Sequence, residues 1–109
     1  VRNLDPVAVR AGEVLAMATG MGARVLGLGG RCGVLRPGTQ ADLIVVDREQ
    51  PHLQPFHGPE LLVYAARGSD VRTVIVGGRL VVREGTLLTM DLAETMARVR
   101  ELAEPLIGP

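Results

Sequence analysis

The stretch that decides the fold is RPGTQADLIVVD, residues 36–47, in which a Pro-Gly pair precedes four apolar residues set between two aspartates. Pro37 and Gly38 suit the two central positions of a type II turn, because proline fixes the first φ and glycine accepts the positive second one. The continuous apolar run 43–46 is typical of a strand covered on both faces. We therefore expect a hairpin turn that leads into a buried strand.

The two aspartates of this stretch, Asp42 and Asp47, raise the question of a catalytic site. In an extended chain their Cα atoms lie about 16 Å apart, which is too far for two carboxylates acting on one bond. We expect instead that each marks an end of the strand, facing solvent and neighbouring backbone amides. If the strand is buried, replacing Leu43 by alanine should cost about 2–5 kcal/mol of stability.

Two short helices are predicted upstream, in DPVAVRAGEVLAMATGMGARVLGLGG, residues 5–30. Apolar residues recur there at spacings of three and four, and Gly20 and Gly22 divide the run. The second helix is expected to end at Gly29-Gly30. The run GLGGRCG follows a helix, whereas a phosphate-binding loop follows a strand, so we expect it to end the helix and turn into the first strand.

Downstream, the segment 49–59 holds three prolines and is expected to be a loop without a regular element. ELLVYAA, 60–66, predicts one or two helical turns, in which Tyr64 fills a gap in the core. Residues 71–88 predict a β-meander, because alternating apolar residues are separated by Gly-Gly and Glu-Gly turns.

A C-terminal helix is predicted to begin after Asp91, which is a good N-cap with Glu94 as its capping-box partner. Pro105 is expected to end this helix. An apolar stripe follows the helical period and is expected to cover the chain's own sheet. The stripe consists of Leu92, Met96, Val99, Leu102 and Leu106.

The composition excludes several classes of function. The 109 residues suffice for one small domain, the charges balance at twelve against twelve, and no lysine is present. One Tyr and one Phe leave no aromatic platform for nucleic acid, and no apolar run could cross a membrane. Cys32 is the only cysteine, which favours a reducing cytoplasm and an incidental thiol. Val1 stands where an initiator Met would, so we expect sequence upstream.

The two histidines, His52 and His57, lie five apart in the proline-rich loop. A hydrolytic metal site needs three or more protein ligands on rigid elements, and the spacing does not match the pair that shares one helical face. We expect each imidazole to hydrogen-bond a backbone carbonyl or water. Neither histidine, nor Arg67 beside the short helix, is proposed as a ligand.

Four motifs together resemble one enzyme family. They are EVLAMATGMGARVLGL (13–28), GVLRPGTQADLIVVD (33–47), PHLQP (51–55) and LVYAARGSDVRTVIVGGRLVVREGTLL (62–88). The set is similar to the C-terminal part of an amidohydrolase-superfamily enzyme, in the group of cytosine-type and adenosine-type deaminases and triazine chlorohydrolases. The motif at 33–43 alone is shared with dihydroorotase-like and deacetylase-like relatives.

The resemblance implies an α+β fragment. Residues 1–30 would be terminal helices that pack on a (β/α)8 barrel largely absent from this chain. Residues 31–90 would supply the C-terminal strands of a small composite β-sandwich, with the proline-rich loop 49–59 between them. Residues 91–109 would form the closing helix.

The implied activity is metal-dependent hydrolytic deamination or dechlorination of a nitrogen heterocycle, with zinc or iron in the full-length enzyme. The family's His-x-His pair does not occur in this sequence, so we assign the chain no catalytic residue and no metal ligand, and its substrate-binding residues stay unknown. The chain alone is therefore expected to be inactive. Its expected partners are the missing N-terminal part of the same polypeptide and further copies of itself.

Two alternatives remain open. A truncated reading frame would leave a small non-enzymatic β-protein that oligomerises through its open strand edges. A dihydroorotase-like or deacetylase-like amidohydrolase would share the 33–43 motif, although the run from PHLQP to GSDV argues against that branch.

Overall fold

A computed structural model describes residues 8–108 and shows four helices, four strands and two single turns of 3-10 helix in that range. The helices are α1 (Ala11–Ala18), α2 (Gly20–Val25), α3 (Glu60–Ala65) and α4 (Leu92–Ile107); the strands are β1 (Leu43–Val46), β2 (Val71–Val76), β3 (Arg79–Arg83) and β4 (Thr86–Leu87); the 3-10 turns are η1 (Pro51–Leu53) and η2 (Gly68–Asp70). The expected α+β class is confirmed. Parts of the segments expected at 1–30 and 91–109, namely residues 1–7 and 109, lie outside the described range.

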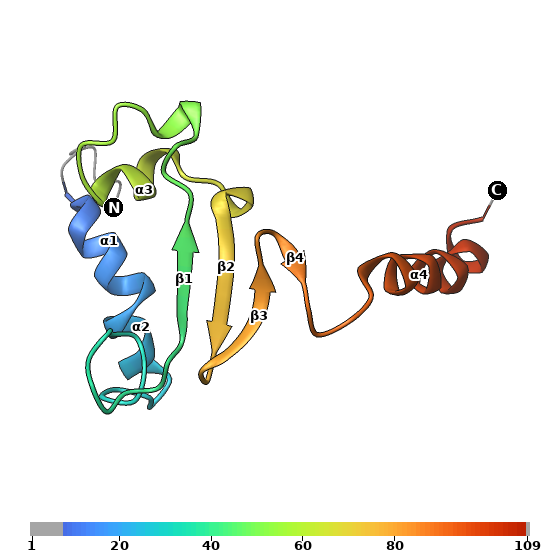
Figure 1. Cartoon of the computed structure of the whole chain (residues 1–109), viewed down its shortest axis with the longest axis horizontal. Coiled ribbons are helices and arrows are strands. Elements are labelled where there is room, and N and C mark those ends of the chain that lie inside the picture. Colours follow the sequence, from blue (N-terminus) through green and yellow to red (C-terminus); the bar gives the residue numbers. More distant parts are fainter. Residues whose placement is uncertain (1–7, 109) are drawn as a thin grey trace.

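The strands form one antiparallel sheet in the order β1-β2-β3-β4 (Figure 1). Gly77 and Gly78 have φ values of 56° and 78°, as a two-residue type I′ hairpin turn requires. Glu84 and Gly85 repeat the pattern with φ values of 48° and 79°. The predicted meander is confirmed, because β2, β3 and β4 are consecutive antiparallel strands joined by these two turns.

The Pro37-Gly38 turn is of type II, since the Thr39 N–H donates to the Arg36 carbonyl oxygen at 3.2 Å and Gly38 has a φ of 90°. The hairpin expected around it is wrong, because no strand lies between residue 8 and the turn. β1 pairs with β2 instead, with Leu43 opposite Ile75. The proline-rich segment also differs from expectation, because η1 forms one regular turn inside it.

The expectation that β1 is covered on both faces is wrong for this chain. Ile44 is 57% exposed and Val45 is 49% exposed. One edge of β1 is paired with β2, but the described residues place no second layer over both faces of the strand. The apolar run therefore forms a strand without the burial that such a run normally accompanies.

The two N-terminal helices are confirmed, but the second ends earlier than expected. The Leu28 N–H donates to the Ala23 carbonyl at 2.8 Å and the Gly27 N–H donates to the Arg24 carbonyl at 3.0 Å. Gly27 has a φ of 75°. These are the two bonds of a Schellman motif, so Gly27 ends the helix before Gly29-Gly30 is reached.

The N-cap of α4 is confirmed, because an Asp91 carboxylate oxygen accepts from the Glu94 N–H at 2.9 Å. Pro105 does not end the helix, which continues to Ile107. Pro105 removes one helical N–H, but bonding resumes after it, because the Gly108 N–H donates to the Glu104 carbonyl oxygen at 3.3 Å. The chain turns at Gly108, whose φ is 76°.

Helix α4 projects away from the sheet (Figure 1). Its apolar stripe is exposed, from 47% at Met96 to 87% at Leu106. The expectation that this stripe covers the chain's own sheet is therefore wrong. The connection between β4 and α4 leads the helix outward instead.

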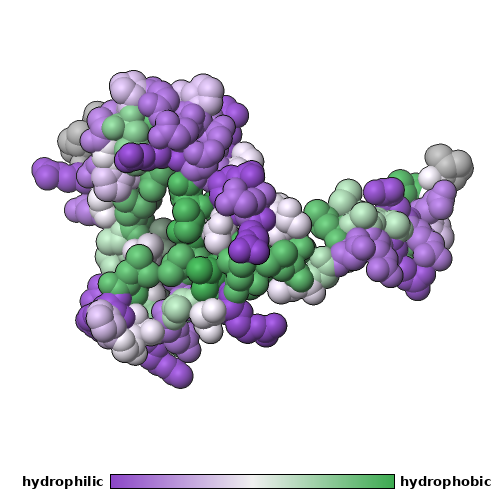
Figure 2. Space-filling view, viewed as in Figure 1, coloured by the Kyte–Doolittle hydropathy of each residue, from purple (hydrophilic) through white to green (hydrophobic). Residues whose placement is uncertain are grey.

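The apolar core is small. Among the described residues only Ala11, Ala23 and Leu53 are buried apolar side chains. The radius of gyration is 18.3 Å, against about 13 Å for a compact domain of this length. The exposed surface is 8815 Å², against about 5,800 Å² for a folded monomer of this mass. Figure 2 shows hydrophobic side chains running across the hollowed face of the body, so much apolar surface is unmatched within the chain.

Candidate functional site

The strongest polar cluster joins His52 in η1 to Asp70 at the end of η2. The His52 Nε2 atom lies 2.7 Å from Asp70 Oδ2. The side chains are 22% and 3% exposed, respectively. The same Asp70 oxygen accepts from the Arg67 N–H at 2.7 Å. Residues 18 positions apart in the sequence thus share one buried carboxylate.

Local sequence explains how both residues reach this place. Gln50 is extended and Pro51 opens η1, the position where a missing N–H costs least. Arg67 is also extended, and Asp70 sits three residues later, where its carboxylate can return to the Arg67 N–H. The turn is closed by the Asp70 N–H, which donates to the Arg67 carbonyl at 3.0 Å.

The hydrogen bond from His52 holds the pKa of Asp70 below its ordinary value of 3.8, and the Arg67 N–H lowers it further. Asp70 is therefore ionised at neutral pH and can only accept hydrogen bonds. It follows that His52 Nε2 carries a proton. The carboxylate fixes the tautomer and the orientation of the ring, as in Asp-His pairs of many enzymes.

A catalytic pair would need a nucleophile or metal beside the imidazole. Within residues 8–108 no group of three or more His, Cys, Asp or Glu side chains could hold a metal ion. The residues of this range do not by themselves form the metal centre that the family resemblance implies. The His52–Asp70 pair has the geometry of a dyad and belongs to no metal-ligand cluster within residues 8–108.

The expectation that His52 bonds a backbone carbonyl or water is wrong, because its partner is a carboxylate. His57 is exposed and does not join the pair. Arg67 contributes its backbone N–H to the cluster rather than its side chain. The sequence contains no periodic signal linking positions 52 and 70, so Asp70 was missed as a partner.

The two aspartates that flank β1 bind amides, as expected. Asp42 Oδ1 accepts from the Gly77 N–H at 2.6 Å and so ties the start of β1 to the β2–β3 turn. Asp47 accepts from the Glu49 N–H at 3.0 Å and from Gln50 Nε2 at 2.7 Å. The Glu49 amide and then the Gln50 side chain lower the pKa of Asp47.

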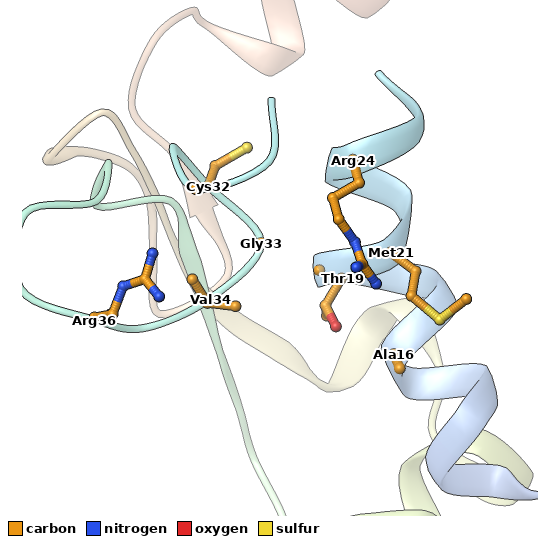
Figure 3. Close-up of a pocket in the computed structure, with 10 residues that line it drawn as sticks. Ala16, Thr19, Met21, Arg24, Cys32, Gly33, Val34 and Arg36 are labelled. Atoms are coloured by element: carbon orange, nitrogen blue, oxygen red, sulfur yellow. The ribbon is translucent and has the colours of Figure 1, made fainter. Parts of the chain in front are cut away.

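A hollow of about 350 Å³ separates the α1–α2 region from the loop that holds Cys32. Figure 3 shows Cys32, Val34 and Arg36 on one side and Thr19, Met21 and Arg24 on the other. Cys32 is a half-buried free thiol. The hollow combines no base with a nucleophile, so its residues assemble no recognisable reaction chemistry.

Gly33, beside that hollow, allows the loop to approach the helices closely. A Cβ at Gly33 would lie 2.8 Å from both the Ala23 Cβ and the Thr19 carbonyl oxygen, and its φ is 84°. The glycine run at 27–33 therefore ends α2 and brings the following loop back against it.

A larger hollow of about 700 Å³ lies between α2 and the strands β1 and β2. Its lining is mainly aliphatic, including Leu26, Ile44 and Val74. The charged group there is Asp42, which is already bonded to the Gly77 N–H. An aliphatic surface with its polar group satisfied is suited to packing rather than to binding a polar substrate.

Tyr64 was expected to fill a gap in the core, but it is 75% exposed, so that expectation is wrong. Over residues 8–108, none of the helices combines the length and the apolar character needed to cross a bilayer.

Curated relatives that resemble this chain include deaminases of adenosine-type compounds. The chain is 56% identical over 102 residues to the 5-methylthioadenosine/S-adenosylhomocysteine deaminase of Syntrophobacter fumaroxidans, covering 93% of this chain and 23% of that protein. It is 41% identical to the 5′-deoxyadenosine deaminase of Methanosarcina mazei, covering 95% and 24%. The chain thus spans about a quarter of the length of the curated relatives that it matches.

Solved structures agree. An adenosine deaminase from Xanthomonas campestris with bound zinc matches with a TM-score of 0.85 at 37% identity, over 89% of this chain and 22% of that one. An atrazine chlorohydrolase from Arthrobacter aurescens, complexed with zinc and atraton, matches with a TM-score of 0.78 at 27% identity, over 88% and 21%. The resemblance drawn from the four motifs is confirmed.

The family model described as "Amidohydrolase family" matches residues 2–81, most of the chain. The match includes the Pro37-Gly38 turn, the strand β1 and the His52–Asp70 pair. This chain belongs to the amidohydrolase family.

Proposed function

We propose that this chain is the C-terminal part of a metal-dependent amidohydrolase whose complete form hydrolytically deaminates an adenosine-type nucleoside modified at its 5′ position. The observation that carries the proposal is the 56% identity to a 5-methylthioadenosine/S-adenosylhomocysteine deaminase across nearly the whole chain. Relatives named 5′-deoxyadenosine deaminase support the same substrate class.

Deamination is favoured over dechlorination. The adenosine deaminase structure matches at 37% identity, whereas the atrazine chlorohydrolase matches at 27%. The curated relatives at 39–56% identity are deaminases. Both matched structures carry zinc, which supports one divalent metal in the complete enzyme.

The chain's own contribution is structural. We assign it no metal ligand, because the described residues do not form a suitable group, and we propose that it is inactive alone. In the complete enzyme the metal would polarise the attacking water. The helices would pack on the barrel and the sheet would form part of the small β-sandwich.

The large solvent-accessible area of the chain supports packing against another part of the same polypeptide. The chain exposes 8815 Å², about 3,000 Å² more than a folded monomer of its mass. A standard protein complex buries only about 800 Å² of surface on each partner. The excess area of this chain is therefore larger than one such interface would cover. We infer that the N-terminal part of the same polypeptide covers most of it.

The test compares the full-length, metal-loaded protein with the 109-residue chain. Ammonia release is measured with 5-methylthioadenosine, S-adenosylhomocysteine and 5′-deoxyadenosine. Chloride release from a chlorotriazine and ring opening of dihydroorotate are measured in parallel as comparison reactions. We expect deamination by the full-length protein and none by the chain. Failure of all three nucleosides would refute the substrate class, and activity with stoichiometric zinc in the chain would refute its inactivity.

A second candidate is a small β-protein that self-associates. It is favoured by the exposed apolar residues of β1, an edge strand of the sheet. Light scattering on the 109-residue chain at high concentration tests it. A strictly monomeric species would eliminate this candidate without affecting the deaminase proposal.

A further inference from the structure

The geometry assigns to His52 and Asp70 the role of a joint that fixes the helical layer, defined as α1, α2 and α3, to the four-stranded sheet. In this joint His52 is a positioning residue, held in the tautomer that carries its proton on Nε2. The inference concerns the arrangement of two parts of the fold and is independent of the proposed substrate.

In the described part of the chain, helices pack mainly on helices and strands on strands. α1 packs on α2 and on α3, and each strand packs on its sheet neighbour. No helix packs on a strand as extensively as these elements pack on one another. The space between α2 and the strands β1 and β2 is the hollow of about 700 Å³. Within residues 8–108 the helical layer and the sheet thus share little direct packing.

The turn η1 packs on α3. Leu53 in η1 is fully buried, with 0% exposure. The neighbouring His52 makes its bond to Asp70, the residue directly before β2. One short turn therefore contacts the helical layer through its packing and the sheet through its imidazole.

Several segments of the chain meet at Asp70. Its carboxylate accepts from His52 and from the Arg67 N–H, which follows α3. Its carbonyl oxygen accepts from the Asp47 N–H at 2.8 Å, directly after β1. Asp70 thus links the end of β1, the turn η1, the exit of α3 and the start of β2.

Histidine has a chemical equivalent that tests this role. The side-chain nitrogen of glutamine is separated from Cα by the same number of bonds as histidine Nε2, whereas that of asparagine corresponds to Nδ1. His52→Gln should therefore keep the donor that Asp70 needs, and His52→Asn should remove it. A buried carboxylate that loses a donor is costly to the fold around it.

The experiment uses the full-length protein and measures amide hydrogen exchange by mass spectrometry. We expect His52→Asn to speed exchange at the amides of Asp47 and Arg67 about ten- to a hundredfold, the range for losing a hydrogen bond to a charged group. His52→Gln should stay within about threefold of the unchanged protein, well under one such bond. The β2–β3 amides should be unchanged in both variants.

A distance measurement reads the joint itself. Spin labels at Tyr64 on α3 and Arg79 on β3, two side chains that the described residues leave exposed, report the placement of the helical layer relative to the sheet in the full-length protein. We expect the distance distribution to broaden in His52→Asn and to remain narrow in His52→Gln. Nitrogen NMR of the imidazole should show the proton on Nε2.

Each outcome decides the inference. Broadening and faster exchange in His52→Asn, with rescue by His52→Gln, support it. It is overturned if His52→Asn leaves both readouts unchanged, if both variants lose protection throughout β2 and β3, or if the proton lies on Nδ1. Deaminase activity enters none of these readouts, so failure here leaves the proposed function intact.

Discussion

Replacing Leu53 by alanine tests whether η1 contains the main packed contact of this chain. Leu53 is the one large side chain that is fully buried among the described residues. A buried Leu→Ala change costs about 2–5 kcal/mol, because the apolar contacts are lost and a cavity remains. The other buried apolar side chains, Ala11 and Ala23, are small. We therefore expect a loss of about 3 kcal/mol, a large share of the roughly 5–15 kcal/mol of a typical domain.

The assay is urea unfolding followed by circular dichroism. With a slope of about 1–3 kcal/mol per molar urea, a loss of about 3 kcal/mol lowers the midpoint by about 1–3 M. The control is Leu106→Ala in α4, the same chemical change at a side chain that is 87% exposed. It should alter the free energy of unfolding by no more than about 0.5 kcal/mol. Equal effects of the two substitutions would refute the assignment of η1 as the packed centre.

Three further predictions use other parts of the chain. Gly33→Ala should lower the free energy of unfolding by about 1–3 kcal/mol, because its Cβ would lie 2.8 Å from a neighbouring side-chain carbon and φ is 84°. Gly12→Ala in α1, where nothing lies within 4 Å, should instead raise that free energy by up to about 1 kcal/mol. Urea midpoints that shift in the same direction for both variants would contradict this prediction. Asp91→Ala should destabilise α4 by about 0.5–2 kcal/mol, seen as faster exchange of its first-turn amides, with Asp91→Asn as the control that retains a cap. Because the folded pKa of Asp70 is lowered, its contribution to stability is present above pH 3.8 and is lost as the pH falls below that value through the folded pKa. A difference in unfolding free energy between Asp70→Asn and the unchanged chain that stays constant as the pH falls from neutral to well below 3.8 would refute it.

The elements that the sequence predicted correctly carry their signals within a few residues. The Gly77-Gly78 pair and its flanking apolar alternation suffice to specify a hairpin, since only those residues must adopt positive φ. Asp91 and the Glu94 amide that it binds are three positions apart. The same holds for the Pro37-Gly38 turn, although its residues could not show that β1 pairs across a much longer connection.

The His52–Asp70 pair could not be predicted for the opposite reason. Its partners are 18 positions apart, belong to two separate 3-10 turns and follow no helical or strand period. A proline-rich loop with histidines is typical of an exposed irregular segment. Its placement depends on the packing of η1 on α3 and on the burial of Leu53, tertiary features for which the sequence of this turn gives only one apolar residue as a signal.

Three of the wrong expectations fail in one direction. β1 was expected to be covered, Tyr64 to be buried and the α4 stripe to lie on the sheet, yet each is exposed in this chain. Hydrogen bonding behaves differently: among the described residues, no buried side-chain nitrogen or oxygen lacks a partner. Polar groups can be satisfied by neighbours in a few turns of chain, whereas apolar faces need a second layer to cover them. A chain with complete polar contacts and incomplete apolar burial is what a part of a larger fold leaves exposed, and this contrast supports the proposal that the rest of an amidohydrolase covers it.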